Sequence, residues 1–286
     1  MLWFMEGICF LPFFLVIWSS STFIVSYLIA LFEHDVDVIF PYISDTGAKP
    51  PESCIFGLMT VITAFASMAT MYARYKYVEK LNEKAGGVPL VLNQAALWIG
   101  TLSCLGMCFV ATFQETTITA VHDAGALLFF VSGVLYTILQ SIISYKAFPY
   151  GCSMALCHVR TGIATIAFLA VFPTVVCAVF VTQTTLHRKT EDEVQYEHMF
   201  TKNTTHVTTK MDDILDPYRL DRPEKLYVSI SVSIRLSLSL QDNVFHLVSA
   251  VSEWIVAFSF IFFFFTYIHD FKKFTLQLRT QFVDYS

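Results

Sequence analysis

The chain has 286 residues, of which 55% are hydrophobic and only 14% are charged, and its formal net charge is −5. A soluble domain carries about 25% charged residues, so this composition excludes an ordinary water-soluble domain and indicates a protein built for lipid. The small negative charge, without a basic stripe of interleaved aromatic residues, excludes nucleic acid as an expected partner.

Six apolar runs follow one another along the chain. Each is long enough to cross the roughly 30 Å hydrocarbon layer of a bilayer as a helix. The fold class that they predict is an all-α membrane protein, a six-transmembrane-helix bundle forming a single domain over 1–286. The expected helices cover about 8–32, 54–73, 90–113, 119–144, 161–183 and 244–268.

The connection between the first two runs, 33–53, is rich in Pro, Asp and Gly, which favour turns and a compact loop. We interpret Ser44 and Asp45 as caps for local backbone groups. Glu52 falls in the first turn of the next helix, where the helix dipole favours a negative charge. The alternative is that Asp45 and Glu52 are acid sites.

Small residues recur at helical spacing in the third and fourth runs, and they predict narrow seams where helices approach closely. Gly125 and Gly133 share one face of the fourth run. In the third run the small residues are Ala96, Gly100, Cys104 and Cys108.

Cys152 and Cys157 lie in a short connection beside the membrane. One interpretation is that they are small packing residues. The other is S-palmitoylation of both thiols.

The distribution of basic residues predicts the orientation. Four Lys or Arg residues lie in 74–89, two in 145–160 and three in the C-terminal tail, whereas 33–53 and 114–118 contain only Lys49. Short basic connections stay on the cytosolic side, so we expect both termini to be cytosolic.

The last connection, about 184–243, is expected to be a long lumenal loop that is partly disordered. Its charges are discounted, because long loops translocate largely regardless of charge. The chain's N-x-S/T sequon falls here, at Asn203, and is either a site of N-glycosylation or unused sequence.

Within that connection, 228–240 alternates Ser with Val, Ile and Leu, which favours a strand. The tract is also of low complexity. We hypothesise that it is retained intron sequence, an idea that its codons in the major spliced transcript would remove.

Ionisable residues in or beside the apolar runs are functional candidates, because a charge buried in a bilayer is costly without a partner. They are His122 and Asp123 in the fourth run, His246 and Glu253 in the sixth, and Glu115 just outside the third. If the fourth and sixth helices are neighbours, these groups form a polar vestibule between them.

Three interpretations of the vestibule compete. It is a buried network that fixes helix packing, or a proton-responsive or lipid-headgroup site, since His titrates near pH 6.5. A zinc hydrolase is the third, but the sequence has neither a His-x-x-x-His nor a His-Glu-x-x-His pattern. We therefore expect no catalytic residues, no bound metal and no cofactor.

Several motifs together resemble the damage-regulated autophagy modulator (DRAM) family, over about 1–183 and 243–280. They are Pro41-Tyr42-Ile43-Ser44-Asp45-Thr46-Gly47, Met71-Tyr72-Ala73-Arg74-Tyr75-Lys76, Ala111-Thr112-Phe113-Gln114-Glu115, His122-Asp123-Ala124-Gly125 and Glu253-Trp254.

The resemblance implies a six-span protein of the lysosomal membrane that promotes autophagy and, in damaged cells, cell death. It implies no enzyme activity. It also implies contacts with lysosomal membrane lipids and with unidentified autophagy or membrane-protein partners. The rival function is a transporter or lipid-handling protein that uses the vestibule.

Overall fold

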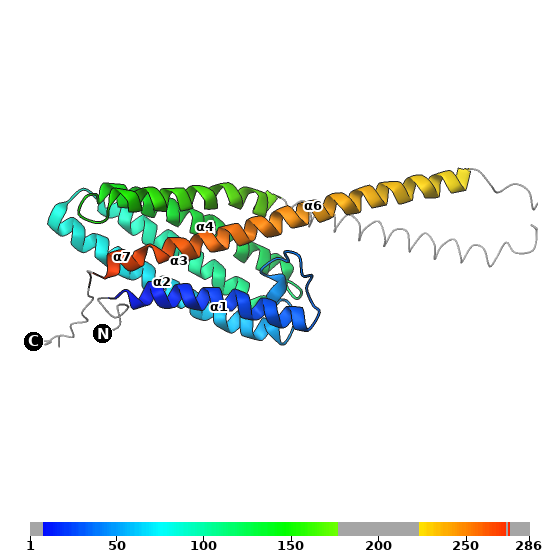
Figure 1. Ribbon diagram of the computed structural model, residues 1–286, viewed down its shortest axis with the longest axis horizontal. Helices are drawn as coiled ribbons and strands as arrows, with labels where there is room; N and C mark the ends of the chain where they lie inside the picture. The colour runs from blue at the N-terminus through cyan, green and yellow to red at the C-terminus, as the bar shows by residue number, and fades with distance from the viewer. Residues whose placement is uncertain (1–7, 177–222, 273, 275–286) are drawn as a thin grey trace, which may run out of the picture. The chain divides into compact units, whose positions relative to one another are not determined.

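The computed structural model describes residues 8–176, 223–272 and 274, with the side chains of 223–243 outside that description. The regular structure of these residues is helical throughout (Figure 1). The labelled elements are α1 (Phe10–Phe32), η2 (Asp45–Gly47), α2 (Glu52–Ala85), α3 (Leu90–Thr112), α4 (Thr119–Lys146), α6 (Pro223–Phe265) and α7 (Tyr267–Phe271).

Among the residues that the structure describes, six helical stretches are long and apolar enough to cross a membrane, which confirms the predicted all-α, six-span class. They include an unlabelled helix, Met154–Val176, between α4 and α6. The six stretches are Phe10–Phe32, Glu52–Ala85, Leu90–Thr112, Thr119–Lys146, Met154–Val176 and Val244–Phe271.

Helix α2 runs to Ala85, well beyond the expected end at 73. Hydropathy reports only the part of a helix that suits lipid, and the extra turns are polar. Ion pairs between Lys76 and Glu79 (2.7 Å) and between Lys80 and Glu83 (2.8 Å) join residues on neighbouring turns. The fifth helix likewise begins at Met154 and not at 161.

The expected strand over 228–240 is wrong, because this segment is part of α6, which begins at Pro223. A single strand would leave its backbone N–H and C=O groups without a partner strand. A helix pairs those groups within itself and continues directly into the apolar run that follows. The loop assigned to 184–243 is correspondingly shorter. The sequon at Asn203 and the part of that loop expected to be disordered lie outside the described residues.

The chain divides into two compact units with boundaries at Phe172 and Ala250. In the unit Pro173–Ser249, the hydroxyl of Ser249 donates a hydrogen bond to the backbone oxygen of Thr174 (2.9 Å), which links α6 to the helix Met154–Val176. The other unit holds the remaining described helices and the sites below.

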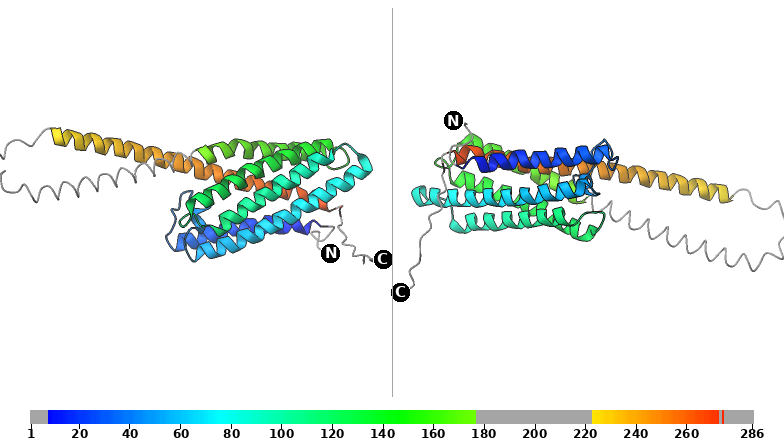
Figure 2. Two further views of the ribbon diagram at one scale, coloured as in Figure 1. Left: turned by 180° about the vertical axis from the view of Figure 1, so that it is seen from behind. Right: turned by 90° about the horizontal axis from the view of Figure 1, so that it is seen from below.

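In that larger unit α1 packs on α2, α2 on α3, and α3 on α4 (Figure 2). Of the expected seam on α3, Ala96, Gly100 and Cys104 are buried, whereas Cys108 is only partly buried. Gly106 and Gly125 bring α3 and α4 together, since a Cβ atom on Gly106 would lie 2.7 Å from the Gly125 backbone oxygen.

The two described ends of the chain meet. The backbone N–H of Ile8 donates to the backbone oxygen of Phe274 (3.1 Å), so both ends lie at the same end of the larger unit. An even number of spans requires this arrangement.

Candidate functional site

The first polar site lies where the connection between α1 and α2 packs on α6. Glu253 is buried, and its Oε2 accepts a hydrogen bond from the backbone N–H of Ile43 (3.0 Å). The next residue, Trp254, donates its indole N–H to the backbone oxygen of Pro41 (2.9 Å). These two bonds fix the connection between α1 and α2 on the helix.

Two further carboxyl groups complete this site, which we call the carboxyl cluster: Asp45, Glu115 and Glu253. Burial, and then the nearby Glu115 carboxylate, raise the pKa of Asp45 from its ordinary 3.8 to about 7. Asp45 and Glu115 also act electrostatically on Glu253. Asp45 accepts a hydrogen bond from the Tyr42 backbone, in line with its expected capping role, whereas the cap expected from Ser44 is wrong, because its side chain makes no capping hydrogen bond to η2.

The carboxyl cluster predicts a stability that depends on pH. The folded state holds the Asp45 proton more tightly than the unfolded chain, so this stabilisation is complete below about pH 4 and is lost as pH rises through about 7. We expect the thermal unfolding midpoint of the purified protein to decrease as the pH is raised from 5 to 8, with a loss of stability of up to about 3 kcal/mol.

Asp45→Asn should flatten this pH dependence of the thermal unfolding midpoint, because asparagine does not titrate. Asp37→Asn, at an exposed position of the same connection, should leave it unchanged. A variant at Asp45 that keeps the full slope would assign the effect to another group.

The structure brings together only some of the expected vestibule residues. His122 is buried, and its Nδ1 donates to the backbone oxygen of Phe113 (2.7 Å), which fixes the turn between α3 and α4. Asp123 points outward and is exposed, although it lies within electrostatic reach of Glu115. His246 is half-buried and belongs to the smaller unit, Pro173–Ser249.

A second site was not predicted, and we call it the arginine–aspartate cluster: Arg74, Arg160 and Asp270. These side chains come from α2, from the helix Met154–Val176 and from α7. Nη1 of Arg74 and Nη2 of Arg160 each lie 2.6 Å from Oδ2 of Asp270, and all three side chains are at most 1% exposed. Oδ1 of Asp270 has no hydrogen-bond partner among the described residues.

Neighbouring groups support the two guanidinium groups that share this single carboxylate. Arg160 donates to the hydroxyls of Ser144 and Thr266 (both 2.9 Å), and Arg74 to the side-chain oxygen of Gln140 (3.3 Å). Both guanidinium carbons lie 5.1 Å from the centre of the Tyr267 ring, whose electron-rich face attracts cations. The cluster therefore ties together α2, α4, α7 and the helix Met154–Val176.

Sequence reasoning missed this cluster because it counted Arg74 and Arg160 as charges of cytosolic connections. Both lie at the edge of an apolar run, and Asp270 lies two residues after the end of another. An acidic residue at the end of a span, with arginines at the ends of others, is the signal that could have indicated a buried ion pair. The predicted orientation therefore depends on the lysines and Arg279.

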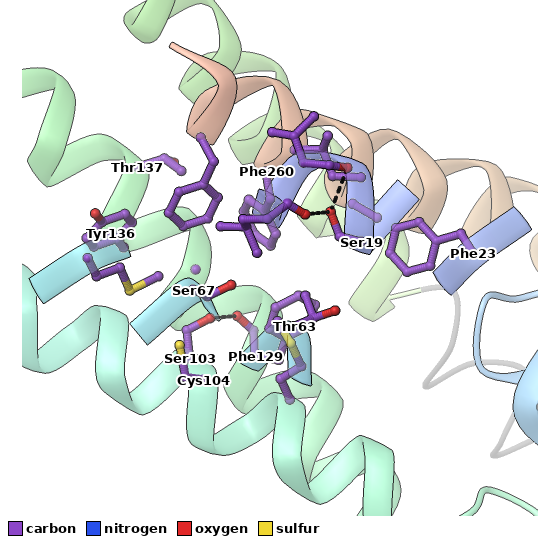
Figure 3. Close-up of a pocket in the computed structure, with 18 residues that line it drawn as sticks. Ser19, Phe23, Thr63, Ser67, Ser103, Cys104, Phe129, Tyr136, Thr137 and Phe260 are labelled. Carbon is purple, nitrogen blue, oxygen red and sulfur yellow. Dashed lines mark hydrogen bonds between the residues drawn. The ribbon is translucent and has the colours of Figure 1, made fainter. Parts of the chain in front are cut away.

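A cavity of about 60 Å³ lies in the middle of the larger unit (Figure 3). Most of its lining is apolar. The hydroxyl groups on its wall, such as those of Ser19 and Ser103, donate their hydrogens to backbone oxygens and therefore do not offer them to the cavity. Tyr136 also lines it, and its hydroxyl lies 3.0 Å from that of Tyr267. The cavity thus adjoins the arginine–aspartate cluster.

The structure offers little for metal binding. In the described parts of the chain no group of three or more His, Cys, Asp or Glu side chains could hold a metal ion.

Cys152 and Cys157 are both buried, so acylation of either thiol would require the connection 147–153 to open.

Apolar helices that enclose buried ionisable groups define a multi-pass α-helical membrane protein. Residues 7–274 match the model of a family described as the Frag1/DRAM/Sfk1/Cwh43P N-terminal domain, and the chain belongs to this family. The resemblance found in the motifs is confirmed.

Relatives extend over nearly the whole chain. DNA damage-regulated autophagy modulator protein 1 of Mus musculus is 41% identical over 284 residues, covering 99% of both chains. DNA damage-regulated autophagy modulator protein 2 of Homo sapiens is 34% identical over 279 residues, covering 98% of this chain and 90% of its own. The modulator of macroautophagy TMEM150B of Danio rerio is 32% identical over 141 residues, covering 49% of this chain and 59% of its own. No solved structure matches.

Proposed function

We propose that this chain is a lysosomal membrane protein that promotes autophagy and, in damaged cells, apoptosis, without catalysis of its own. The observation that carries the proposal is the similarity to proteins named as autophagy modulators over 98–99% of the chain. Both termini face the cytosol in this proposal, and the carboxyl cluster faces the lumen.

The carboxyl cluster favours the proposed location in an acidic compartment. Asp45, with its pKa raised to about 7 by burial and by Glu115, binds a proton on transfer from neutral to acidic surroundings. That proton removes the repulsion between the two carboxylates and strengthens the fold, so the connection 33–51 is best ordered in acid.

The partners of the protein in this proposal would be lysosomal membrane lipids and autophagy or membrane proteins that reach the cytosolic connections.

The test is rescue of autophagic flux in cells that lack the endogenous protein. Re-expression should restore turnover of a lipidated autophagosome marker, measured with and without a block of lysosomal degradation, and after DNA damage it should restore caspase activation. The protein should colocalise with a marker of acidic lysosomes. A protein that reaches lysosomes and restores neither readout would overturn the proposal.

A transporter or lipid-handling protein is the second candidate function, and the observation that favours it is the buried Glu253. Ionisable residues inside a membrane bundle commonly mark transport pathways. If the protein acts through its cytosolic connections, Glu253→Gln and Asp123→Asn should leave flux intact. Loss of flux from a correctly folded and located Glu253→Gln protein would favour transport. Asp123→Asn is the matched exposed control.

A further inference from the structure

Cys152, in the connection between α4 and the helix Met154–Val176, faces Cys157 in the first turn of that helix. Their Sγ atoms are 3.1 Å apart, and both residues are buried. A disulfide brings two sulfurs to about 2.05 Å. The two thiols therefore need to approach by only about an ångström for a bond to form.

We propose that Cys152 and Cys157 are a modification site, a dithiol that a peroxide oxidises reversibly to a disulfide. The bond would fasten the connection 147–153 to the first turn of the helix that follows it. The proposal is independent of the function proposed above. It also competes with palmitoylation, because a sulfur in a disulfide cannot carry an acyl group.

The chemistry proceeds in two balanced steps. Cys152 is 6% exposed and Cys157 0%, so the Cys152 sulfur meets the oxidant first. It attacks one peroxide oxygen, the O–O bond breaks, and sulfenic acid and one water form. The Cys157 sulfur then attacks the Cys152 sulfur and displaces its hydroxyl group as a second water. Two thiols and one hydrogen peroxide thus give one disulfide and two waters, and an added dithiol reverses the oxidation.

The rate of the first step follows from the surroundings of Cys152. Burial, and then the hydrogen bond with Cys157, raise the pKa of the Cys152 thiol to about 12. The thiolate is the reactive form and is scarce at neutral pH. The pair should therefore respond to sustained oxidant and not to a brief pulse, and its oxidation should accelerate as pH rises.

The position of the pair gives the bond a structural consequence. The Cys152 sulfur lies 3.6 Å from the backbone oxygen of Ser144, and the Ser144 hydroxyl accepts a hydrogen bond from Arg160 (2.9 Å). Oxidation removes the S–H group that donates to Ser144, but the new covalent bond links the connection to the first turn of the following helix and constrains the unfolded chain. The oxidised protein should therefore unfold at a higher temperature than the reduced protein.

The experiment uses the purified full chain in lipid nanodiscs, treated with hydrogen peroxide or left reduced. Free thiols are then alkylated in denaturant, and the protein is digested with trypsin. The fragment 147–160, between Lys146 and Arg160, contains Cys152 and Cys157 and no other cysteine. After oxidation it should carry no alkyl group and be lighter than the reduced, unalkylated fragment by two hydrogen atoms. Oxygen added to Met154 is resolved by mass.

Cys157→Ser is the matched variant, because it leaves Cys152 without a resolving thiol and should show no peroxide-dependent rise in the unfolding midpoint. Exposed Cys54 is the internal control for the oxidant and should either stay alkylatable or gain oxygen, without forming a disulfide. Three results would overturn the proposal: both cysteines of 147–160 alkylated after sustained peroxide, sulfinic acid on either, or a hydroxylamine-sensitive acyl group on the fragment isolated from cells.

Discussion

Asp270→Asn is expected to destabilise the folded protein by about 3–5 kcal/mol, because it removes the carboxylate from a fully buried charge cluster. Arg74 and Arg160 both bind Oδ2 of Asp270 at 2.6 Å. Without the negative charge, two guanidinium groups face each other with no water to screen them. Thermal unfolding in detergent should show a loss of roughly 10 °C in the midpoint or no folded monomer.

Two comparisons separate this effect from the loss of any ion pair. Asp35→Asn removes an ion pair with Lys49, whose side chain is 55% exposed, and should leave the thermal midpoint nearly unchanged. Arg160→Met leaves a balanced pair between Arg74 and Asp270 and should therefore cost less than Asp270→Asn. Equal midpoints for Asp270→Asn and Asp35→Asn would mean that the buried carboxylate does not hold the cluster together.

The membrane-spanning helices were predictable because lipid imposes one local rule. A span must be apolar over a fixed length, and each run from 8–32 to 244–268 can be judged without knowing its neighbours. The same rule explains the misplaced ends. Helix α2 continues beyond its apolar run to Ala85, since ion pairs between adjacent turns, and not hydropathy, support its last part.

The strand expected over 228–240 has a related cause. A period of two in Ser and Leu was taken to report backbone conformation, yet a strand also needs a partner. The adjacent apolar run supplied helical continuity instead, and α6 includes the tract. Pattern was a weaker guide here than the need to pair every backbone polar group.

The sites were predicted less well, because they depend on which helices are neighbours. Glu253 was correctly singled out as an ionisable residue inside a span, and its partner is the backbone of Ile43, 210 positions away. Asp123 was singled out by the same argument, but it lies on the outer face of α4. The rule identifies residues that need an explanation and does not indicate which way they face.

Gly106→Ala should destabilise the protein by about 2–3 kcal/mol, although it adds only one methyl group. A Cβ atom at this position would lie 2.5 Å from the backbone nitrogen of Phe129 and 2.7 Å from the backbone oxygen of Gly125. Backbone atoms cannot rotate away as a side chain can, so α3 and α4 must separate along their seam. The thermal midpoint in detergent should fall accordingly.

Gly162→Ala is the matched control, because it makes the same change inside the helix Met154–Val176 where, apart from the local helix backbone and the two adjacent residues, no atom lies within 4 Å of the added carbon. It should be neutral or raise stability by up to about 1 kcal/mol, since alanine has a higher helix propensity than glycine. If both alanine variants had the wild-type midpoint, α3 and α4 would not be in contact at Gly106. If both lost stability equally, the cost would belong to alanine in these helices and not to the seam.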